Sequence, residues 1–133
     1  MLRDWLRDSG GTRIDIDYHA IHRTGFITNW LTIDGQRKTV RLPAKINFAR
    51  THLHEAQVDP HRGAWTYSHL WMEASDGVLH QESDWMCTPD MEDIADLGAY
   101  KTELDRYPRD QEFIPDWLRD KVERWRLERG PVV

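Results

Sequence analysis

The alternation of apolar and polar side chains predicts where the strands of this chain lie. From Thr12 onward, Ile14, Ile16 and Tyr18 take every second position, with polar side chains between them. A period of two is typical of a strand that buries one face and exposes the other. A second strand is predicted over 26–33, which is rich in aromatic and β-branched residues.

Two Asp-Gly pairs mark tight turns between predicted strands. Asp34-Gly35 leads from the second strand into a returning strand over 36–42. Asp76-Gly77 joins predicted strands over 64–74 and 78–85. Asp-Gly is favoured in two-residue hairpin loops, because both positions take a positive φ. The sequence therefore predicts two β-hairpins.

The sequence allows two registers for the first strand of the second hairpin, which differ in the side of the strand that is buried. We expect Trp65 and Trp71, which share one side of that strand, to face a covering helix. Thr66, Ser68 and Leu70 are then the more exposed residues. The opposite register, which buries Leu70 and Met72, stays open as an alternative.

Helical spacing of apolar residues identifies the remaining elements. The predicted helices cover residues 2–8, 44–57, 91–104 (interrupted) and 115–128. This order predicts an α+β fold: an antiparallel meander sheet of about five strands, covered on one face by helices, with further helices at the C-terminus. At 133 residues the chain is expected to form a single domain, residues 1–133.

Two proline motifs join the last predicted helices. Tyr107-Pro108-Arg109-Asp110 ends one helix, and Pro115 opens the next at a position where a missing N–H costs nothing. We interpret both motifs as structural, because they fix the angle between the helices, and we expect Trp117 to dock in the core.

The composition indicates a folded protein of a reducing compartment. Seven Trp, four Tyr and three Phe argue against disorder, since each aromatic side chain buries a large area. The one cysteine, Cys87, excludes an internal disulfide. No apolar run is long enough to span a membrane, and residues 1–5 lack the apolar core of a signal peptide. We expect a cytoplasmic protein with no membrane partner.

The sequence offers little support for metal or cofactor chemistry. His52 and His54 fall in a predicted helix, where side chains two apart diverge, so we interpret them as surface histidines. Cys87 lies among acids, which raise the pKa of a thiol. No phosphate-binding or dinucleotide-binding motif occurs. We predict no metal and no cofactor.

The enzyme alternative depends on Glu82 and Asp84, which share one face of a predicted strand. Two carboxylates among twenty-three Asp and Glu residues do not single out an acid/base pair. We therefore predict a protein that is not an enzyme. Nucleic-acid binding has one weak support, a loosely basic run that we interpret as a solvated edge strand and helix: Arg37, Lys38, Arg41, Lys45 and Arg50.

Charge is distributed unevenly along the chain. Residues 73–120 hold fourteen Asp or Glu against four Lys or Arg, although the whole chain has a formal net charge of only −5. Such a region attracts cationic partners and repels nucleic acid. Bulky aromatic residues lie among its acids, a mixture that suits a protein interface.

Four segments carry a resemblance to a known family. They are Gly63-Ala64-Trp65-Thr66, Ser75-Asp76-Gly77, Glu82-Ser83-Asp84-Trp85 and residues 104–118, LDRYPRDQEFIPDWL. Together they resemble the YezG-type immunity proteins of polymorphic toxin systems, over roughly residues 26–119. The resemblance implies a small cytoplasmic protein that binds and neutralises a toxin encoded beside it, commonly one with a nuclease domain.

The leading hypothesis is therefore an immunity protein that occludes the cationic active site of a cognate toxin. The alternative is a small regulatory or scaffold module for another basic protein. In either case the expected partner-binding residues are carboxylates, which would mimic phosphates, and two aromatic anchors: Asp84, Trp85, Asp90, Glu92, Asp93, Asp96, Tyr100, Asp105, Asp110 and Glu112.

Overall fold

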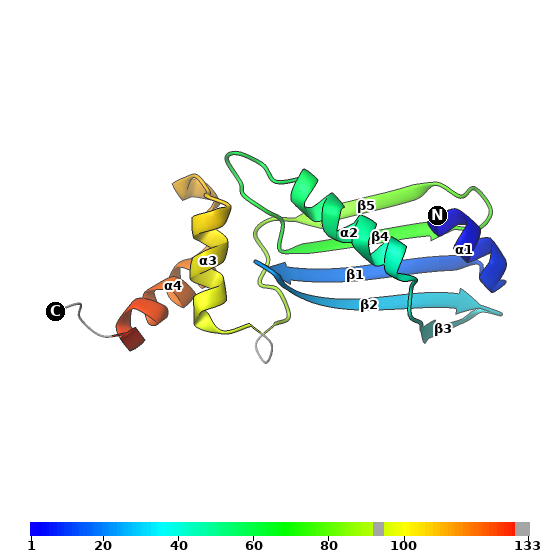
Figure 1. Ribbon diagram of the computed structural model, residues 1–133, viewed down its shortest axis with the longest axis horizontal. Helices are drawn as coiled ribbons and strands as arrows, with labels where there is room; N and C mark the ends of the chain where they lie inside the picture. The colour runs from blue at the N-terminus through cyan, green and yellow to red at the C-terminus, as the bar shows by residue number, and fades with distance from the viewer. Residues whose placement is uncertain (92–94, 130–133) are drawn as a thin grey trace.

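The computed structural model describes residues 1–91 and 95–129, which form an α+β fold around one five-stranded antiparallel sheet (Figure 1). The strands are β1 (Arg13–Ile21), β2 (Thr24–Ile33), β3 (Gln36–Thr39), β4 (Tyr67–Glu73) and β5 (Leu79–Asp84). The helices are α1 (Leu2–Ser9), α2 (Ala44–Ala56), α3 (Leu97–Arg106), α4 (Asp116–Arg129) and a short 3-10 turn η1 (Gln111–Phe113). The predicted fold class is confirmed.

The sheet has the strand order β3-β2-β1-β4-β5, so the first strand lies in the middle. β1 to β3 follow one another through tight turns, and α2 then carries the chain over to the other side of β1, where β4 pairs (Figure 1). Asp34 and Gly35 both have positive φ, 52° and 74°, as the predicted hairpin turn requires.

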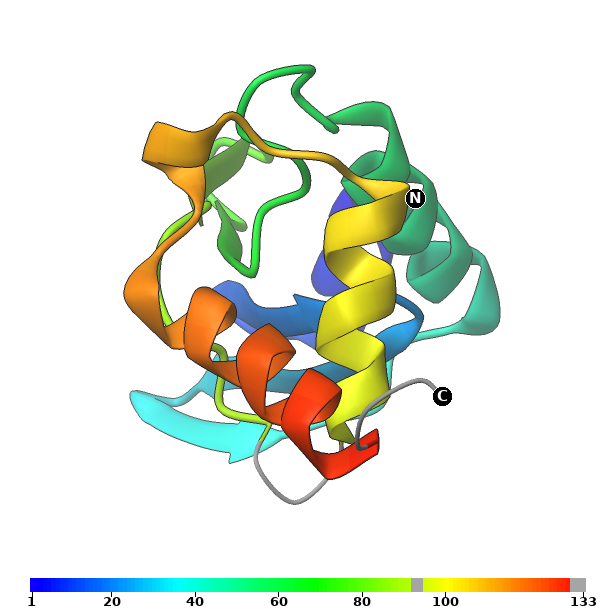
Figure 2. The ribbon, with the colours of Figure 1, turned by 90° about the vertical axis from the view of Figure 1, so that its left-hand side faces the viewer.

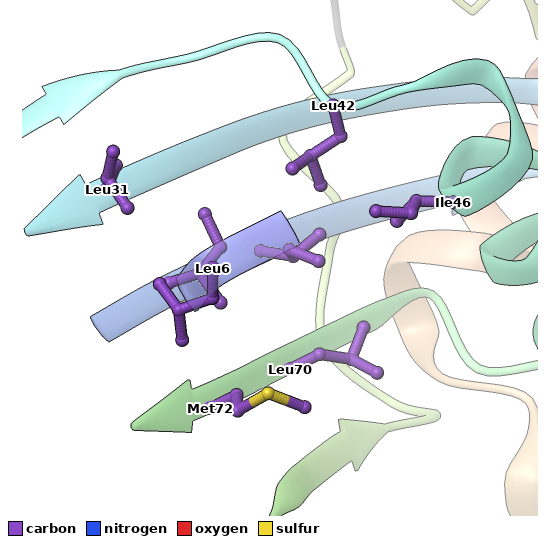
Figure 3. Close-up of a cluster of buried hydrophobic side chains, with 8 residues drawn as sticks. Leu6, Leu31, Leu42, Ile46, Leu70 and Met72 are labelled. Carbon is purple, nitrogen blue, oxygen red and sulfur yellow. The ribbon is translucent and has the colours of Figure 1, made fainter. Parts of the chain in front are cut away.

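One face of the sheet is covered by α1 and α2. Ile14 and Ile16 of β1 are buried there with Leu70 and Met72 of β4. Leu6 of α1 joins this cluster, which Figure 3 shows as a layer of aliphatic side chains over the strands. The predicted alternation of β1 is therefore confirmed on its apolar side.

The predicted register of β4 is wrong. Ser68, Leu70 and Met72 are buried, whereas Trp71 is half-buried on the other side of the strand. The cause is pairing with β1: Leu70 lies opposite Ile16, and directly opposite residues share a face of the sheet. Trp65 is fully buried, but it precedes the strand, so its burial says nothing about the register.

α3 and α4 pack together beyond one end of the sheet, as Figures 1 and 2 show. Their shared core contains Tyr100 of α3 with Leu118 and Val122 of α4, against Ile21 at the end of β1. Trp117 is half-buried at the margin of this core and not inside it.

Two further findings come from the helices. His54 was expected at the surface but is only 3% exposed, with Nε2 at 3.1 Å from the carbonyl oxygen of Trp65. Burial lowers the pKa of this imidazole, which favours its neutral form. Among the described helices, none is long and apolar enough to cross a membrane.

Candidate functional site

A buried arginine joins the segments that build the candidate site. Arg109 is 8% exposed and donates hydrogen bonds to three carbonyl oxygens, those of Ala64, Trp85 and Phe113. The guanidinium thus ties together the chain before β4, the end of β5 and the segment that leads into α4. Burial lowers the pKa of Arg109, and the nearby carboxyl of Glu103 opposes that shift.

Two tryptophans also hold these segments in place, each through a hydrogen bond from its indole N–H. Trp117 Nε1 donates to the carbonyl oxygen of Met86 at 2.7 Å, and Trp85 Nε1 donates to that of Gly63 at 3.1 Å. The guanidinium of Arg62 lies 3.8 Å from the centre of the Trp85 ring, so this ring is also held by a cation–π contact.

Gly63 makes this close approach feasible. Its φ is +74°, and an added Cβ would lie 2.8 Å from the carbonyl oxygen of Tyr107 and 2.9 Å from a side-chain carbon of Arg109. A larger residue would therefore push the Arg109 segment away from the sheet.

Four of the predicted partner-binding residues lie on the segments that Arg109 holds together. Trp85 and Phe113 place their carbonyl oxygens on the same nitrogen of Arg109, so the residues just before them, Asp84 and Glu112, lie on adjacent stretches of chain. Met86 adds an exposed apolar side chain, 38% of which is accessible. We call the following set the clasp surface: Asp84, Trp85, Met86, Asp110 and Glu112.

The carboxylates of the clasp surface are exposed, and the structure positions two of them. Asp84 accepts hydrogen bonds from the backbone N–H groups of Met86 and Cys87, at 2.7 and 3.0 Å. Asp110 Oδ2 lies 2.8 Å from His61 Nδ1. In each carboxylate the second oxygen makes none of these contacts, so both side chains can still bind a cationic partner.

Other predicted residues lie elsewhere. Asp96 caps α3 by accepting from the N–H of Ala99, and Asp105 forms an ion pair with Lys101 on the same helix. Asp90 is exposed beside His19, at the end of the central strand. Glu92 and Asp93 lie outside the described residues.

Tyr100 was expected to be a surface anchor, and this expectation is wrong. Its side chain is 2% exposed, because α3 turns that face toward α4. A partner could reach this ring only after the two helices separated. The sequence pattern could have indicated burial, since Tyr100 shares the helical stripe of the apolar residues around it.

Cationic residues of α4 lie beside the acidic region. This helix packs along α3 and brings Lys121 to 5.4 Å from the Tyr100 ring centre and Arg129 to 4.7 Å from that of Trp125. The charged residues that line the hollow between the two helices are Asp96 and Glu128 together with Lys121, Arg124 and Arg129. The surface of α3 and α4 is therefore mixed in charge, whereas the clasp surface exposes the carboxylates of Asp84, Asp110 and Glu112.

The face of the sheet opposite α1 and α2 carries a second polar network that sequence reasoning missed. Asp15 accepts from Arg13 at 3.0 Å and lies 2.8 Å from His69 Nε2. Tyr67 donates its hydroxyl to Asp17 at 2.7 Å. The signal was present in the polar half of each alternation, since these residues occupy every second position of β1 and β4.

The structure favours one protonation state for each of two groups in this network, the ionised form of Asp15 and the protonated form of Tyr67. Burial disfavours ionised Asp15, but the hydrogen bonds from Arg13 and His69 outweigh burial and keep its pKa below the usual value. Burial and then Asp17 raise the pKa of Tyr67, so its hydroxyl stays protonated. Such groups suit the binding of cations or hydrogen-bond partners more than proton transfer near neutral pH.

The open face continues the clasp surface. Asp84 lies opposite Tyr67, and Glu82 lies opposite His69, so both β5 carboxylates project to the side of the sheet that carries Asp17. Negative side chains therefore extend from the clasp surface along this part of the sheet.

Two further candidate groups are the Cys87 thiol and possible metal ligands. Burial, together with Asp84, raises the pKa of the Cys87 thiol, against a hydrogen bond from Thr66. In the described part of the chain, no three His, Cys, Asp or Glu side chains are grouped to hold a metal ion. Comparison of the sequence with protein-family models and with curated proteins found no match.

Proposed function

We propose that the protein is a stoichiometric, non-enzymatic immunity protein of the cytoplasm, which neutralises a basic toxin domain by covering its active site. The clasp surface is the contact region. The resemblance of residues 26–119 to YezG-type immunity proteins supports this proposal independently of the charge argument.

The observation that carries the proposal is the charge balance at the clasp surface. Asp84, Asp110 and Glu112 are exposed there, whereas Arg109, the cation of the same segment, is buried against carbonyl oxygens. Arg62, whose guanidinium lies over the Trp85 ring, forms an ion pair with Asp59. A surface that keeps its carboxylates in solvent and withdraws its guanidinium is complementary to a cationic cleft.

A nuclease is the toxin class that best fits such a surface, because it must present a cationic cleft to bind phosphates. Exposed carboxylates can take the places of those phosphates. Trp85 and Met86 supply apolar contact area among them. Long-range attraction speeds the encounter, while desolvated aromatic contacts slow dissociation.

The test is co-expression with the toxin domain encoded beside this chain. We expect wild-type protein to protect the host and the double reversal Asp110→Lys with Glu112→Lys to lose protection while keeping its melting temperature. Association of the wild-type protein with the toxin should also slow as salt is raised, since attraction between exposed charges is screened beyond about 8 Å at physiological ionic strength.

Two matched controls separate site from net charge. Asp4→Lys with Asp8→Lys makes the same change of charge on exposed side chains of α1, and it should leave protection intact. Arg37→Glu with Lys38→Glu alters the basic edge strand β3 and should also do little. Loss of protection in either control, with the clasp variant still protective, would place the contact elsewhere. A neighbouring gene without a toxin would favour the regulatory-module alternative.

A further inference from the structure

A cavity of about 470 Å³ lies where three segments meet at one end of the sheet. They are the turn between β1 and β2, the C-terminal half of α2 and the last turn of α3, at the end of the sheet that α3 covers in Figure 1. We call this cavity the α2–α3 pocket, and its volume is in the range of small-molecule sites. Its lining includes Arg23, Arg106, Glu55, Tyr18, His54 and Tyr107.

Two cations reach the α2–α3 pocket from different segments. Arg23 lies in the turn after β1 and Arg106 in the last turn of α3, and both residues are exposed. Both lower the pKa of His22 through their charge, after burial, so the two guanidinium groups lie near one imidazole. Within the described part of the chain, neither arginine forms an ion pair. Like charges gathered at a cavity without a paired carboxylate favour an anionic occupant.

Glu103 holds the two segments that carry these arginines together. Its buried carboxylate, three residues before Arg106 on α3, accepts a hydrogen bond from the backbone N–H of His22. His22 has a φ of +52°, which is uncommon for a residue with a side chain. Such strained backbone is concentrated at ligand sites. The turn therefore positions Arg23 beside α3 before a ligand arrives.

The other lining groups suit a nucleoside. Tyr107 accepts a hydrogen bond from Arg106 Nε at 3.1 Å, which leaves its own hydroxyl proton to donate. The exposed carboxylate of Glu55 can accept from ribose hydroxyls, as acidic residues do in nucleotide sites. Tyr18 and His54, with ring centres 5.8 Å apart, form an aromatic floor. Aromatic side chains of this kind favour contact with a planar base.

We propose that the α2–α3 pocket binds a nucleoside monophosphate. The phosphate lies between Arg23 and Arg106, because guanidinium groups match phosphate oxygens in shape as well as in charge. The ribose hydroxyls donate to Glu55, and the base packs on Tyr18. Side chains from three segments hold the phosphate here, so no glycine-rich motif marks the site in the sequence. This site is separate from the clasp surface and does not depend on the proposed immunity function.

The test uses five probes with the intact chain: AMP, UMP, the nucleosides adenosine and uridine, and inorganic phosphate. Binding is measured by calorimetry and by amide chemical-shift changes. We expect at least one nucleotide to bind tenfold or more tightly than its nucleoside, which lacks the charge-assisted hydrogen bonds of the phosphate. Inorganic phosphate should bind at least tenfold more weakly than that nucleotide, because it lacks the ribose and the base. The shift changes should map to residues 22–25, 51–55 and 106–107.

Variants then locate the site. Arg23→Gln and Arg106→Gln each remove one charge, so each should weaken nucleotide binding at least fivefold and leave nucleoside binding unchanged. Arg41→Gln, at an exposed arginine just before α2, is the matched control and should bind as wild type does. Gly25 lines the pocket, and an added Cβ would lie 3.4 Å from the Tyr18 ring. Gly25→Val should therefore narrow the pocket and weaken nucleotides and nucleosides alike.

The wild-type comparison alone can overturn the proposal, even if a variant fails to fold. Equal affinity for nucleotide and nucleoside would remove the role of the two arginines. Inorganic phosphate that binds as tightly as both nucleotides would make the pocket a simple anion site. Failure of both nucleotides to bind, or shift changes away from the three segments, would refute the proposal outright.

Discussion

Nη2 of Arg109 donates a hydrogen bond to the carbonyl oxygen of Ala64 at 2.9 Å, between residues 45 positions apart in the chain. Arg109→Ala would leave that carbonyl and two others without their donor. We expect this variant to lose about 2–4 kcal/mol of unfolding free energy, since unmade buried hydrogen bonds are costly. Urea unfolding measures the change.

Arg109→Lys tests whether charge or shape matters at this position. A lysine ammonium cannot reproduce the planar fork of the guanidinium, so it should recover little of the lost stability. Arg106→Ala is the comparison, because that arginine is exposed on the same stretch, and it should change stability by less than about 0.5 kcal/mol. Full rescue by lysine would show that the three-carbonyl geometry is unimportant.

Trp117 tests the interpretation of the proline motif. Because its ring is half-buried and its N–H binds Met86, we expect Trp117→Ala to cost about 2 kcal/mol, less than the loss of a fully buried tryptophan. Trp117→Phe should cost about 1 kcal/mol, the value of the hydrogen bond. An unchanged melting temperature with lost toxin neutralisation would instead make Trp117 a contact residue.

Glu103 gives the protein a defined pH dependence. Burial raises its pKa from 4.5 to about 7, although the His22 backbone N–H and Arg109 oppose the shift. The folded state therefore holds this proton more tightly than the unfolded chain, and the contribution to stability is lost as pH rises from 4.5 to about 7.

Glu103→Gln should abolish this loss. The variant is expected to be more stable than wild type above pH 7 by about 1–3 kcal/mol, with a smaller difference near pH 5. Chemical unfolding at both pH values measures the effect. If the difference between the two proteins is the same at both, the carboxyl does not titrate in this window.

The register of β4 can be tested directly. Leu70→Ala should cost about 2–4 kcal/mol, because it opens a cavity under α2. Trp71→Ala should cost less, although it removes the larger side chain, because this ring lies on the open face between His69 and His80. A greater loss for Trp71 in urea unfolding would contradict the observed register.

The strands and the two Asp-Gly hairpins could be predicted because their signals are local. The alternation of β1 is a property of nine consecutive residues, and the turn at Asp34-Gly35 depends on two. Only the connection across α2 is non-local. No pattern within one strand says that β4 pairs with β1.

The register of β4 could not be predicted for the same reason. Both sides of this strand offer bulky residues, and the size of Trp71 favours the wrong side. The decision comes from Ile14 and Ile16, which lie opposite Met72 and Leu70. His54 is a similar case, since its burial depends on the carbonyl oxygen of Trp65, a partner in another segment.

The candidate site was partly predictable. The acids around Asp110 and Glu112 are visible as a charge excess in the sequence. Arg109, which brings them beside Asp84, reads in the sequence as one more surface cation. Its role follows only from carbonyl oxygens that a sequence does not display.

The central position of β1 also decides the order in which the sheet is completed. β2 folds back on β1 through a short turn, but the other edge of β1 waits for β4, whose Glu73 pairs with Arg13. Closing that long loop is the slow step expected on entropic grounds. During synthesis, we therefore expect one edge of β1 to keep its backbone N–H and C=O groups unpaired until β4, residues 67–73, has left the ribosome.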